Sequence, residues 1–220
     1  MKYYPVCLDI AGRQCLVVGG GAVGSRKVKT LLDCSARVTV ISPAASPYIL
    51  EQAVKGNITY QKREYRSGDL QGMFLTIGAT SDEVLNFKIH REAENAEKLC
   101  NIADRPKACN FILPSIVARG DLLIAISTSG KSPAFAKMLR EQLETEFGPE
   151  YADFLQLMGS IRKQLLAESH EPEEHKPLFE RLIDNGLLKM IAAGQTVEID
   201  GLLSKTLGPG YRYDVLMKME

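Results

Sequence analysis

Three glycines at the spacing G-x-G-x-x-G are the residues of this chain best suited to holding a ligand. Gly19, Gly21 and Gly24 follow the apolar run 15–18 and precede a segment with helical periodicity. Between a strand and a helix, this spacing is typical of dinucleotide binding, because the backbone can approach a pyrophosphate and the helix offers free N–H groups. A turn that only packs a helix against a strand is the structural alternative. The expected cofactor contacts here are Gly19, Gly21, Ala22, Val23 and Gly24.

The end of the second predicted strand, residues 37–41, lacks an acidic residue. Ser42 follows this strand, and Pro43 and Ala44 come next. NAD-binding units usually place Asp or Glu there, where it binds the ribose hydroxyls. Ser42 can hydrogen-bond a ribose, but it has no charge with which to exclude a 2′-phosphate. We expect Ser42, Pro43 and Ala44 to contact the cofactor, while this position leaves the choice between NAD and NADP open.

Alternating strands and helices between residues 8 and 113 predict an α/β fold with a Rossmann-type parallel sheet. The later strands are expected at 37–41, 58–60, 73–79 and 99–102, and the helices at 25–32 and 83–97. Ligands of such sheets bind at the carboxyl ends of the strands. The residues at those ends are Gly19, Ser42, Thr80 and Asp104. We therefore expect them to share one site, with Thr80 as a further cofactor contact.

The pattern changes after Phe111. Apolar segments 111–118 and 122–127 flank a polar turn and predict a β-hairpin. Ser132 and Pro133 then begin a helix that runs to about Phe147. A hairpin and one helix are too small to bury a core, so we expect them to pack against a second copy.

From Pro149 onward the sequence predicts helices, with breaks near Pro172, Pro177, Gly194 and Gly208 to Gly210. The expected organisation is therefore a Rossmann-type NAD-binding domain, a β-hairpin/helix dimerisation segment and a small all-helical domain. Their ranges are 1–113, 114–148 and 149–220.

Composition excludes several classes of protein. The 220 residues include 27 basic and 27 acidic side chains, which argues against broad binding to nucleic acid or to a membrane surface. No apolar run reaches the ~18 residues of a membrane span, and the first residues lack the core of a signal peptide. Five cysteines without C-x-x-C spacing predict buried free thiols in a reducing cytoplasm. No metal site is expected, because His90, His170 and His175 lack ligand spacing and are expected at the surface.

Several motifs resemble one family in order and spacing. Residues 19–27, GGGAVGSRK, are similar to the glycine turn plus Arg-Lys of siroheme synthase N-terminal modules. Residues 101–107, NIADRPK, resemble the Asn-x-x-Asp-x-Pro segment of that family. FILPS at 111–115 and STSGKSP at 127–133 follow in the same register. The resemblance covers about Tyr4 to Phe147, and the helical tail matches only in length and type.

The resemblance is to precorrin-2 dehydrogenase, which is often also a sirohydrochlorin ferrochelatase. It implies NAD-dependent oxidation of precorrin-2 to sirohydrochlorin, followed by insertion of Fe(II), a substrate of the chelatase step. It also implies a homodimer that binds tetrapyrrole substrates. Some family members carry a fused methyltransferase module that makes precorrin-2. This sequence has none, so we expect a separate enzyme to supply the substrate.

By its place in the family motif, Asp104 is the expected catalytic carboxylate and general base. Without the motif, an Asp before Arg-Pro is typical of a turn. Asn101 either positions Asp104, contacts the tetrapyrrole or closes a turn. Thr128 aligns with a family Ser near the active site that is phosphorylated in some members. The expected substrate contacts are Asn101, Lys107, Thr128 and Lys131.

The tetrapyrrole carries many carboxylates, so its cleft should be locally basic. Candidate cations are Arg105, Lys107, Arg119, Lys131, Lys137 and Arg140. Two alternatives to the bifunctional enzyme remain: a dehydrogenase without chelatase activity, and a non-catalytic nucleotide-sensing Rossmann module. Sensing modules usually keep the acid after the second strand and need no carboxylate like Asp104. Ser42 and Asp104 therefore favour an enzyme.

Overall fold

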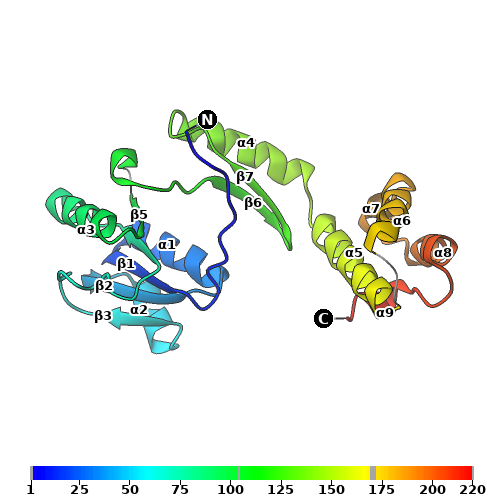
Figure 1. The fold of residues 1–220 in the computed structure, drawn as a ribbon, viewed down its shortest axis with the longest axis horizontal. Coiled ribbons are helices and arrows are strands. Elements are labelled where there is room, and N and C mark those ends of the chain that lie inside the picture. The colour runs from blue at the N-terminus through cyan, green and yellow to red at the C-terminus, as the bar shows by residue number, and fades with distance from the viewer. Residues whose placement is uncertain (1, 104, 169–171, 220) are drawn as a thin grey trace. The chain divides into compact units, whose positions relative to one another are not determined.

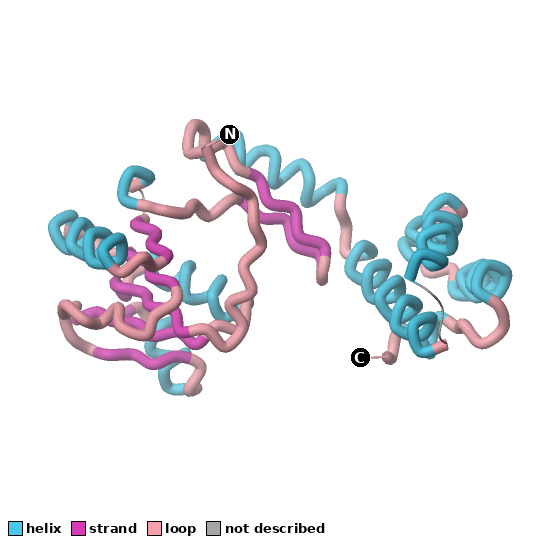
Figure 2. Tube along the Cα trace, viewed as in Figure 1, coloured by secondary structure: helices cyan, strands magenta, loops and turns pink. Residues whose placement is uncertain are grey.

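The computed structural model describes residues 2–103, 105–168 and 172–219 (Figures 1 and 2). The chain consists of two compact units, Met1–Leu113 and Pro114–Glu220. A further division of the second unit into a dimerisation segment and a helical domain stays a prediction.

The first unit contains a five-stranded parallel sheet with the strand order β3-β2-β1-β4-β5. This arrangement confirms the Rossmann-type α/β fold. The strands are β1 (Gln14–Gly20), β2 (Arg37–Ala45), β3 (Ile58–Gln61), β4 (Leu75–Gly78) and β5 (Leu99–Ile102).

Helices cover both faces of this sheet, which is why β1 is buried almost throughout. Cys15 and Val17 pack in one core with α1 (Ala22–Asp33) and α2 (Pro47–Val54). Leu16 and Val18 point to the other core, beside Ile89 of α3 (Glu83–Asn95). A 3-10 helix, η1 (Pro106–Ala108), follows β5.

Strand β2 is longer than expected and is irregular at its end. Val18 pairs with Ile41, whereas Gly20 pairs with Ala45, so β2 has two more residues than β1 between the paired positions. Ser42 therefore lies inside β2, not after it. The extra length fits Pro43, which has no N–H to donate to a sheet ladder. Helix α2 was not expected; it begins at Pro47 after Ser46, whose Oγ accepts a hydrogen bond from Ile49 N at 3.3 Å.

The second unit begins with the expected hairpin, formed by β6 (Ser115–Arg119) and β7 (Leu122–Ile126). Helix α4 (Pro133–Glu146) packs on β6 and is capped by Ser132, whose Oγ accepts from Phe135 N at 3.2 Å. Arg119 ties hairpin to helix because its guanidinium donates to Glu144 O and Phe147 O at 2.9 and 2.8 Å.

The remaining helices are α5 (Glu150–Ala167), α6 (Pro172–Asp184), α7 (Leu187–Ala192), α8 (Thr196–Leu207) and α9 (Tyr213–Leu216). Their core contains Leu157, Ile161, Leu182 and Leu203. The expected break near Pro177 is wrong, because Pro177 lies inside α6. Only one helical hydrogen bond requires the N–H that this proline lacks, and the core formed by the neighbouring helices holds α6 in place. Among the described residues, each helix is too short or too polar to cross a lipid bilayer.

Two further surface and burial expectations need correction. His175 is buried, with 4% of its surface exposed, and the His90 side chain is only 12% exposed. His170 lies outside the described residues. All five cysteines are free, but only Cys15 in β1 and Cys100 in β5 are buried. Cys7 lies before β1 and Cys34 is the C-cap of α1, and both are exposed. Burial raises the pKa of Cys15 to about 11 and that of Cys100 to about 12.

Candidate functional site

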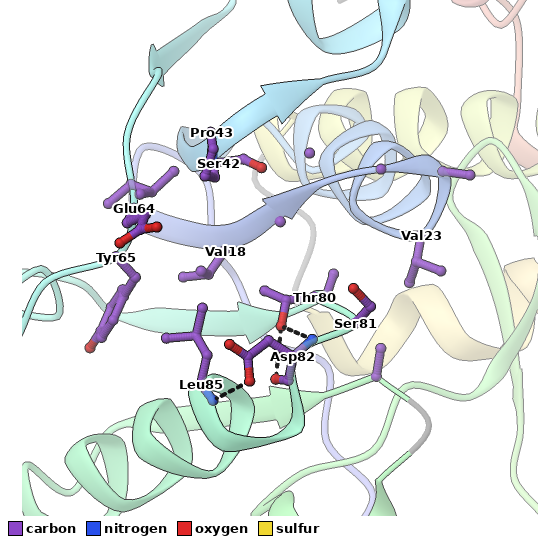
Figure 3. A pocket seen from close by; sticks show the side chains of 17 residues that line it. Val18, Val23, Ser42, Pro43, Glu64, Tyr65, Thr80, Ser81, Asp82 and Leu85 are labelled. Carbon is purple, nitrogen blue, oxygen red and sulfur yellow. Dashed lines mark hydrogen bonds between the residues drawn. The ribbon is translucent and has the colours of Figure 1, made fainter.

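A pocket of about 790 Å³ opens at the carboxyl ends of β1, β2 and β4 (Figure 3). Its size is in the range of sites for small molecules and cofactors. It is lined by residues 18–23 and 41–43, by Glu64 and Tyr65 after β3, by residues 79–82 after β4, and by Leu85 and Ala103. The sheet thus brings together Gly19, Gly21, Ala22, Val23, Ser42, Pro43 and Thr80.

Backbone packing requires glycine at three positions of the turn. A Cβ at Gly19 would lie 2.4 Å from Ala79 O, and Gly19 itself has a φ of +115°. At Gly20 it would lie 2.3 Å from Ala44 O, and at Gly24 2.1 Å from Gly19 O. These neighbours are backbone atoms, so they cannot rotate away as the end of a side chain would.

Gly21 differs because a Cβ there would meet nothing within 4 Å. Gly21 is the N-cap of α1 and has no side-chain cap. The first helical bond runs from Ser25 N to Gly21 O at 2.9 Å, so the N–H groups of residues 22–24 have no acceptor within the helix. With no acidic residue in this turn, the positive end of the helix dipole faces the pocket. These features fit the pyrophosphate of a dinucleotide.

Two expected cofactor contacts do not line the pocket. Gly24 is buried against Gly19 O, and Ala44 O lies beside Gly20. Gly24 packs against the turn itself, whereas the irregular end of β2 brings Ser42 and Pro43, and not Ala44, to the pocket. Ser42 is 8% exposed, and its carbonyl accepts a hydrogen bond from Tyr60 OH at 3.0 Å.

Thr80 is held by a network at the start of α3. Its hydroxyl lies 3.0 Å from Asn86 Oδ1, and its carbonyl accepts from Asn86 Nδ2 at 2.9 Å. Asp82 caps α3 by accepting from Leu85 N at 3.0 Å (Figure 3). Asn86 was not predicted, although a polar residue four positions after the cap residue Asp82, within an otherwise apolar helix turn, was a usable signal.

Glu64 and Tyr65 were also missed as pocket residues. Tyr65 is buried, and its hydroxyl donates to Glu92 Oε2 at 2.6 Å. Burial and the neighbouring Glu92 carboxylate raise the pKa of Tyr65 above its usual value. The loop between β3 and β4 carries no motif, so the sequence offered no signal for either residue.

The expected catalytic residue, Asp104, lies outside the described residues. Ala103, directly before it, lines the pocket and donates its N–H to Gly78 O at 2.8 Å. Asn101 is buried in β5, and its Nδ2 donates to Phe111 O at 3.0 Å, so its amide braces the segment after β5.

The other expected substrate contacts do not line the pocket. Lys107 is exposed in η1 of the first unit. Thr128 and Lys131 belong to the second unit, where Lys131 is exposed. Thr128 Oγ1 donates to Ser132 O at 3.1 Å and accepts from Ser132 N at 3.2 Å, which closes the turn before α4.

Three of the six candidate cations for a basic cleft have acidic neighbours. Arg105 pairs with Glu83, Arg140 with Glu144 and Lys137 with Glu141. These pairs are mostly exposed, so water screens them and they can exchange for a substrate carboxylate. The Arg119 guanidinium donates hydrogen bonds to two carbonyl groups at the end of α4.

Known proteins match both parts of this chain. A model described as "Putative NAD(P)-binding" matches residues 6–115, half of the chain, and one described as "Sirohaem biosynthesis protein central" matches residues 119–146. The structure is similar to that of SirC, precorrin-2 dehydrogenase, with a TM-score of 0.79 and 28% identity, covering 93% of this chain and 99% of that one.

Siroheme synthases are similar in sequence. The protein of Nitrosococcus oceani is 36% identical over 96% of this chain and 45% of its own length. Siroheme synthase 1 of Serratia proteamaculans is 33% identical over 94% of this chain and 44% of its own length. The chain thus spans less than half of these relatives. The chain belongs to the putative NAD(P)-binding family through residues 6–115, and it is similar to siroheme synthases over almost its whole length.

Proposed function

We propose that this chain is a dehydrogenase of siroheme biosynthesis that oxidises precorrin-2 to sirohydrochlorin with NAD. The observation that carries the proposal is the glycine-lined pocket at the strand ends, in a fold similar to that of SirC, precorrin-2 dehydrogenase. The open approach at Gly21 and the free N–H groups after it support pyrophosphate binding at this place.

Residues that line the pocket are proposed to bind the cofactor. Backbone N–H groups at Ala22 and Val23 would hold the pyrophosphate, and Ser42 and Pro43 would contact the adenine-side ribose. Thr80, held by Asn86, closes the opposite wall. When bound, NAD supplies the acceptor for a hydride.

Asp104 is the proposed general base. Oxidation removes a hydride and a proton from the reduced macrocycle, and the carboxylate takes the proton. Its position directly after the pocket residue Ala103 supports this role. Lys107 and Lys131 are proposed to bind carboxylates of the tetrapyrrole. Asn101 and Thr128 are proposed to support substrate binding by positioning the segments after β5 and before α4.

Anaerobic absorbance spectroscopy of precorrin-2 with NAD tests this function. Wild type should form sirohydrochlorin and NADH, whereas Asp104→Ala should lose turnover but still bind NADH. Asp121→Ala, an exposed carboxylate in the hairpin turn, is the matched control and should turn over like wild type. A folded wild type that binds NADH but leaves precorrin-2 unchanged would contradict the enzyme and favour a nucleotide-sensing module.

Insertion of Fe(II) into sirohydrochlorin is the proposed second activity. The Asp104 carboxylate would take up the pyrrole protons that the metal displaces. Adding Fe(II) or Co(II) to the anaerobic product should give the absorbance of the metallated ring in wild type and not in Asp104→Ala. A stable sirohydrochlorin spectrum would instead identify a dehydrogenase without chelatase activity.

A homodimer is proposed through the outer face of the hairpin. Ile116 pairs with Ala125 and Ala118 with Leu123, and all four side chains are exposed. Exposed apolar faces of this kind favour association. Leu123→Asp should give a monomer in light scattering after gel filtration, whereas Leu50→Asp, on α2, should not. A monomeric wild type would rule the dimer out.

The free cysteines support a cytoplasmic location.

A further inference from the structure

Glu64 is a charged residue of the pocket to which the proposed function assigns no role. It lies three residues after β3, and β3 pairs with β2 through Ile41 and Gln61. The last residue of β3 therefore lies close to Ser42, the position where NAD-binding units usually carry the ribose-binding acid. Figure 3 shows Glu64 on the same side of the pocket as Ser42 and Pro43, with Thr80 and Asp82 on the other side.

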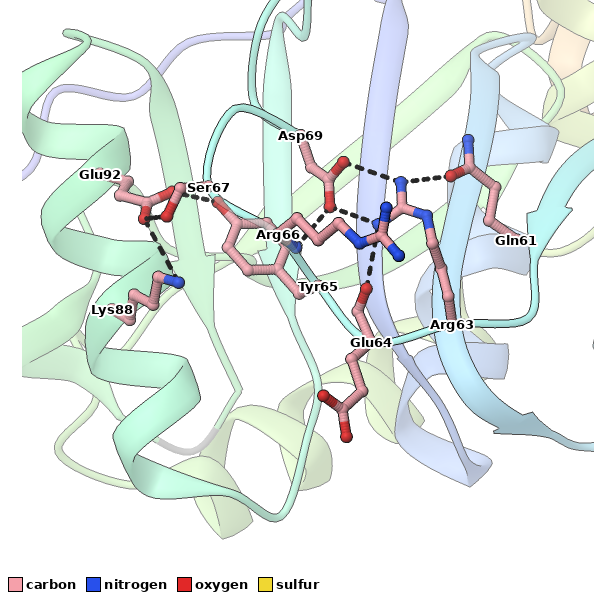
Figure 4. A network of polar contacts seen from close by, with 9 residues as sticks. All are labelled: Gln61, Arg63, Glu64, Tyr65, Arg66, Ser67, Asp69, Lys88 and Glu92. Atoms are coloured by element: carbon pink, nitrogen blue, oxygen red, sulfur yellow. Dashed lines mark hydrogen bonds and ion pairs between the residues drawn. The ribbon is translucent and has the colours of Figure 1, made fainter.

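The backbone before Glu64 is fixed by an ion pair (Figure 4). Arg63 Nη1 and Nη2 each donate to an oxygen of Asp69 at 2.8 Å. The same Nη1 donates to Glu64 O at 3.0 Å, and Asp69 Oδ2 also accepts from Arg66 N at 2.7 Å. The Arg63 guanidinium is thus occupied within the loop.

The backbone after Glu64 is anchored to α3. Tyr65 OH and Ser67 Oγ donate to the two oxygens of Glu92 at 2.6 and 2.7 Å (Figure 4). The Glu64 carboxylate itself is exposed and has no polar partner among the residues that the structure describes. A free carboxylate between two anchored neighbours is well placed to bind a ligand, because little order is lost when it does so.

The charges of the residues that line the pocket favour NAD over NADP. None of the 17 described residues that line it is Lys or Arg, whereas NADP sites use Arg for the 2′-phosphate. A carboxylate near Ser42 would accept hydrogen bonds from ribose hydroxyls and repel a phosphate in the same place.

We propose that Glu64 is the residue that selects NAD over NADP, by binding the adenine-side ribose in place of the acid missing at Ser42. This inference rests on the proposed dinucleotide site. The carboxylate that selects the cofactor would then come from the loop after β3, and not from the end of β2 as in other NAD-binding units.

Binding of NADH and of NADPH, measured by titration calorimetry on the full chain, tests the proposal. Wild type should prefer NADH, and Glu64→Gln should weaken NADH binding by roughly tenfold while NADPH binding stays equal or improves. Glu64→Arg should bind NADPH more tightly than wild type does. Glu51→Gln, an exposed carboxylate on α2 outside the pocket, should leave both affinities unchanged.

An unchanged NADH-to-NADPH ratio in Glu64→Gln would overturn the role of Glu64 while leaving the proposed function intact. A wild type that prefers NADPH would also overturn it, and would point to Lys62 or Arg66 as phosphate ligands. A folded wild type that binds neither nucleotide would contradict the proposed function itself, and this inference with it. Thermal unfolding of each variant shows that its fold is retained.

Discussion

The two ends of the pocket are built by different means. At the glycine turn, backbone lies directly on backbone, and any side chain at Gly19 or Gly24 would collide with a carbonyl oxygen. At the β3–β4 loop, the backbone is held by side chains, through Arg63 with Asp69 and Tyr65 with Glu92. At Gly19, Gly20 and Gly24 the first end has no room for an added carbon atom, whereas the second end depends on polar pairs that can be weakened one at a time.

The largest effect is expected at Gly24. Gly24→Ala places a Cβ 2.1 Å from Gly19 O, so the turn or the helix must shift. We expect a loss of about 3 kcal/mol in the free energy of unfolding, together with loss of NADH binding. Urea unfolding and NADH titration measure both.

Gly21→Ala is the matched control for that substitution. Its Cβ meets no protein atom within 4 Å, so the free energy of unfolding should change by less than ~1 kcal/mol. NADH affinity should nevertheless fall, because the methyl group lies where the pyrophosphate approaches. Equal losses of stability in the two variants would contradict a steric origin for the difference.

The second effect concerns Asp69. Hydrogen bonds from Arg63 hold the pKa of the Asp69 carboxyl below its usual value of 3.8. The stabilisation is therefore present above this value and is lost as the pH falls through the lower, folded-state pKa. Asp69→Asn should reduce the free energy of unfolding by about 2 kcal/mol at pH 7.

The difference between Asp69→Asn and wild type should shrink below about pH 4. Urea unfolding at several pH values measures it, with Glu51→Gln as an exposed-carboxylate control. A difference that is constant with pH would show that the ion pair is not its source.

The same contrast explains what the sequence could predict. Local sequence patterns were sufficient to predict features that depend on neighbours in the chain. These are the turn from β1 to α1, strand β5 and the Ser132 cap. Tyr65 and Glu92 are 27 residues apart, and only the fold brings them together. No periodicity marks such a pair. Helix α2 is a different case, since Ser46 before Pro47 was a readable cap signal.

The smallest effect is expected at Tyr65. Tyr65→Phe removes the hydrogen bond to Glu92 Oε2 but keeps the buried ring, and Ser67 still donates to the other oxygen. We expect a loss of about 1 kcal/mol in the free energy of unfolding. If this anchor also positions Glu64, NADH affinity should fall by a few fold while NADPH affinity hardly changes. Ser67→Ala removes the other bond to Glu92 from a more exposed position, so it should cost less stability than Tyr65→Phe does. A loss of binding for both nucleotides alike in Tyr65→Phe would instead mean that the ring shapes the pocket and the anchor does not act through Glu64.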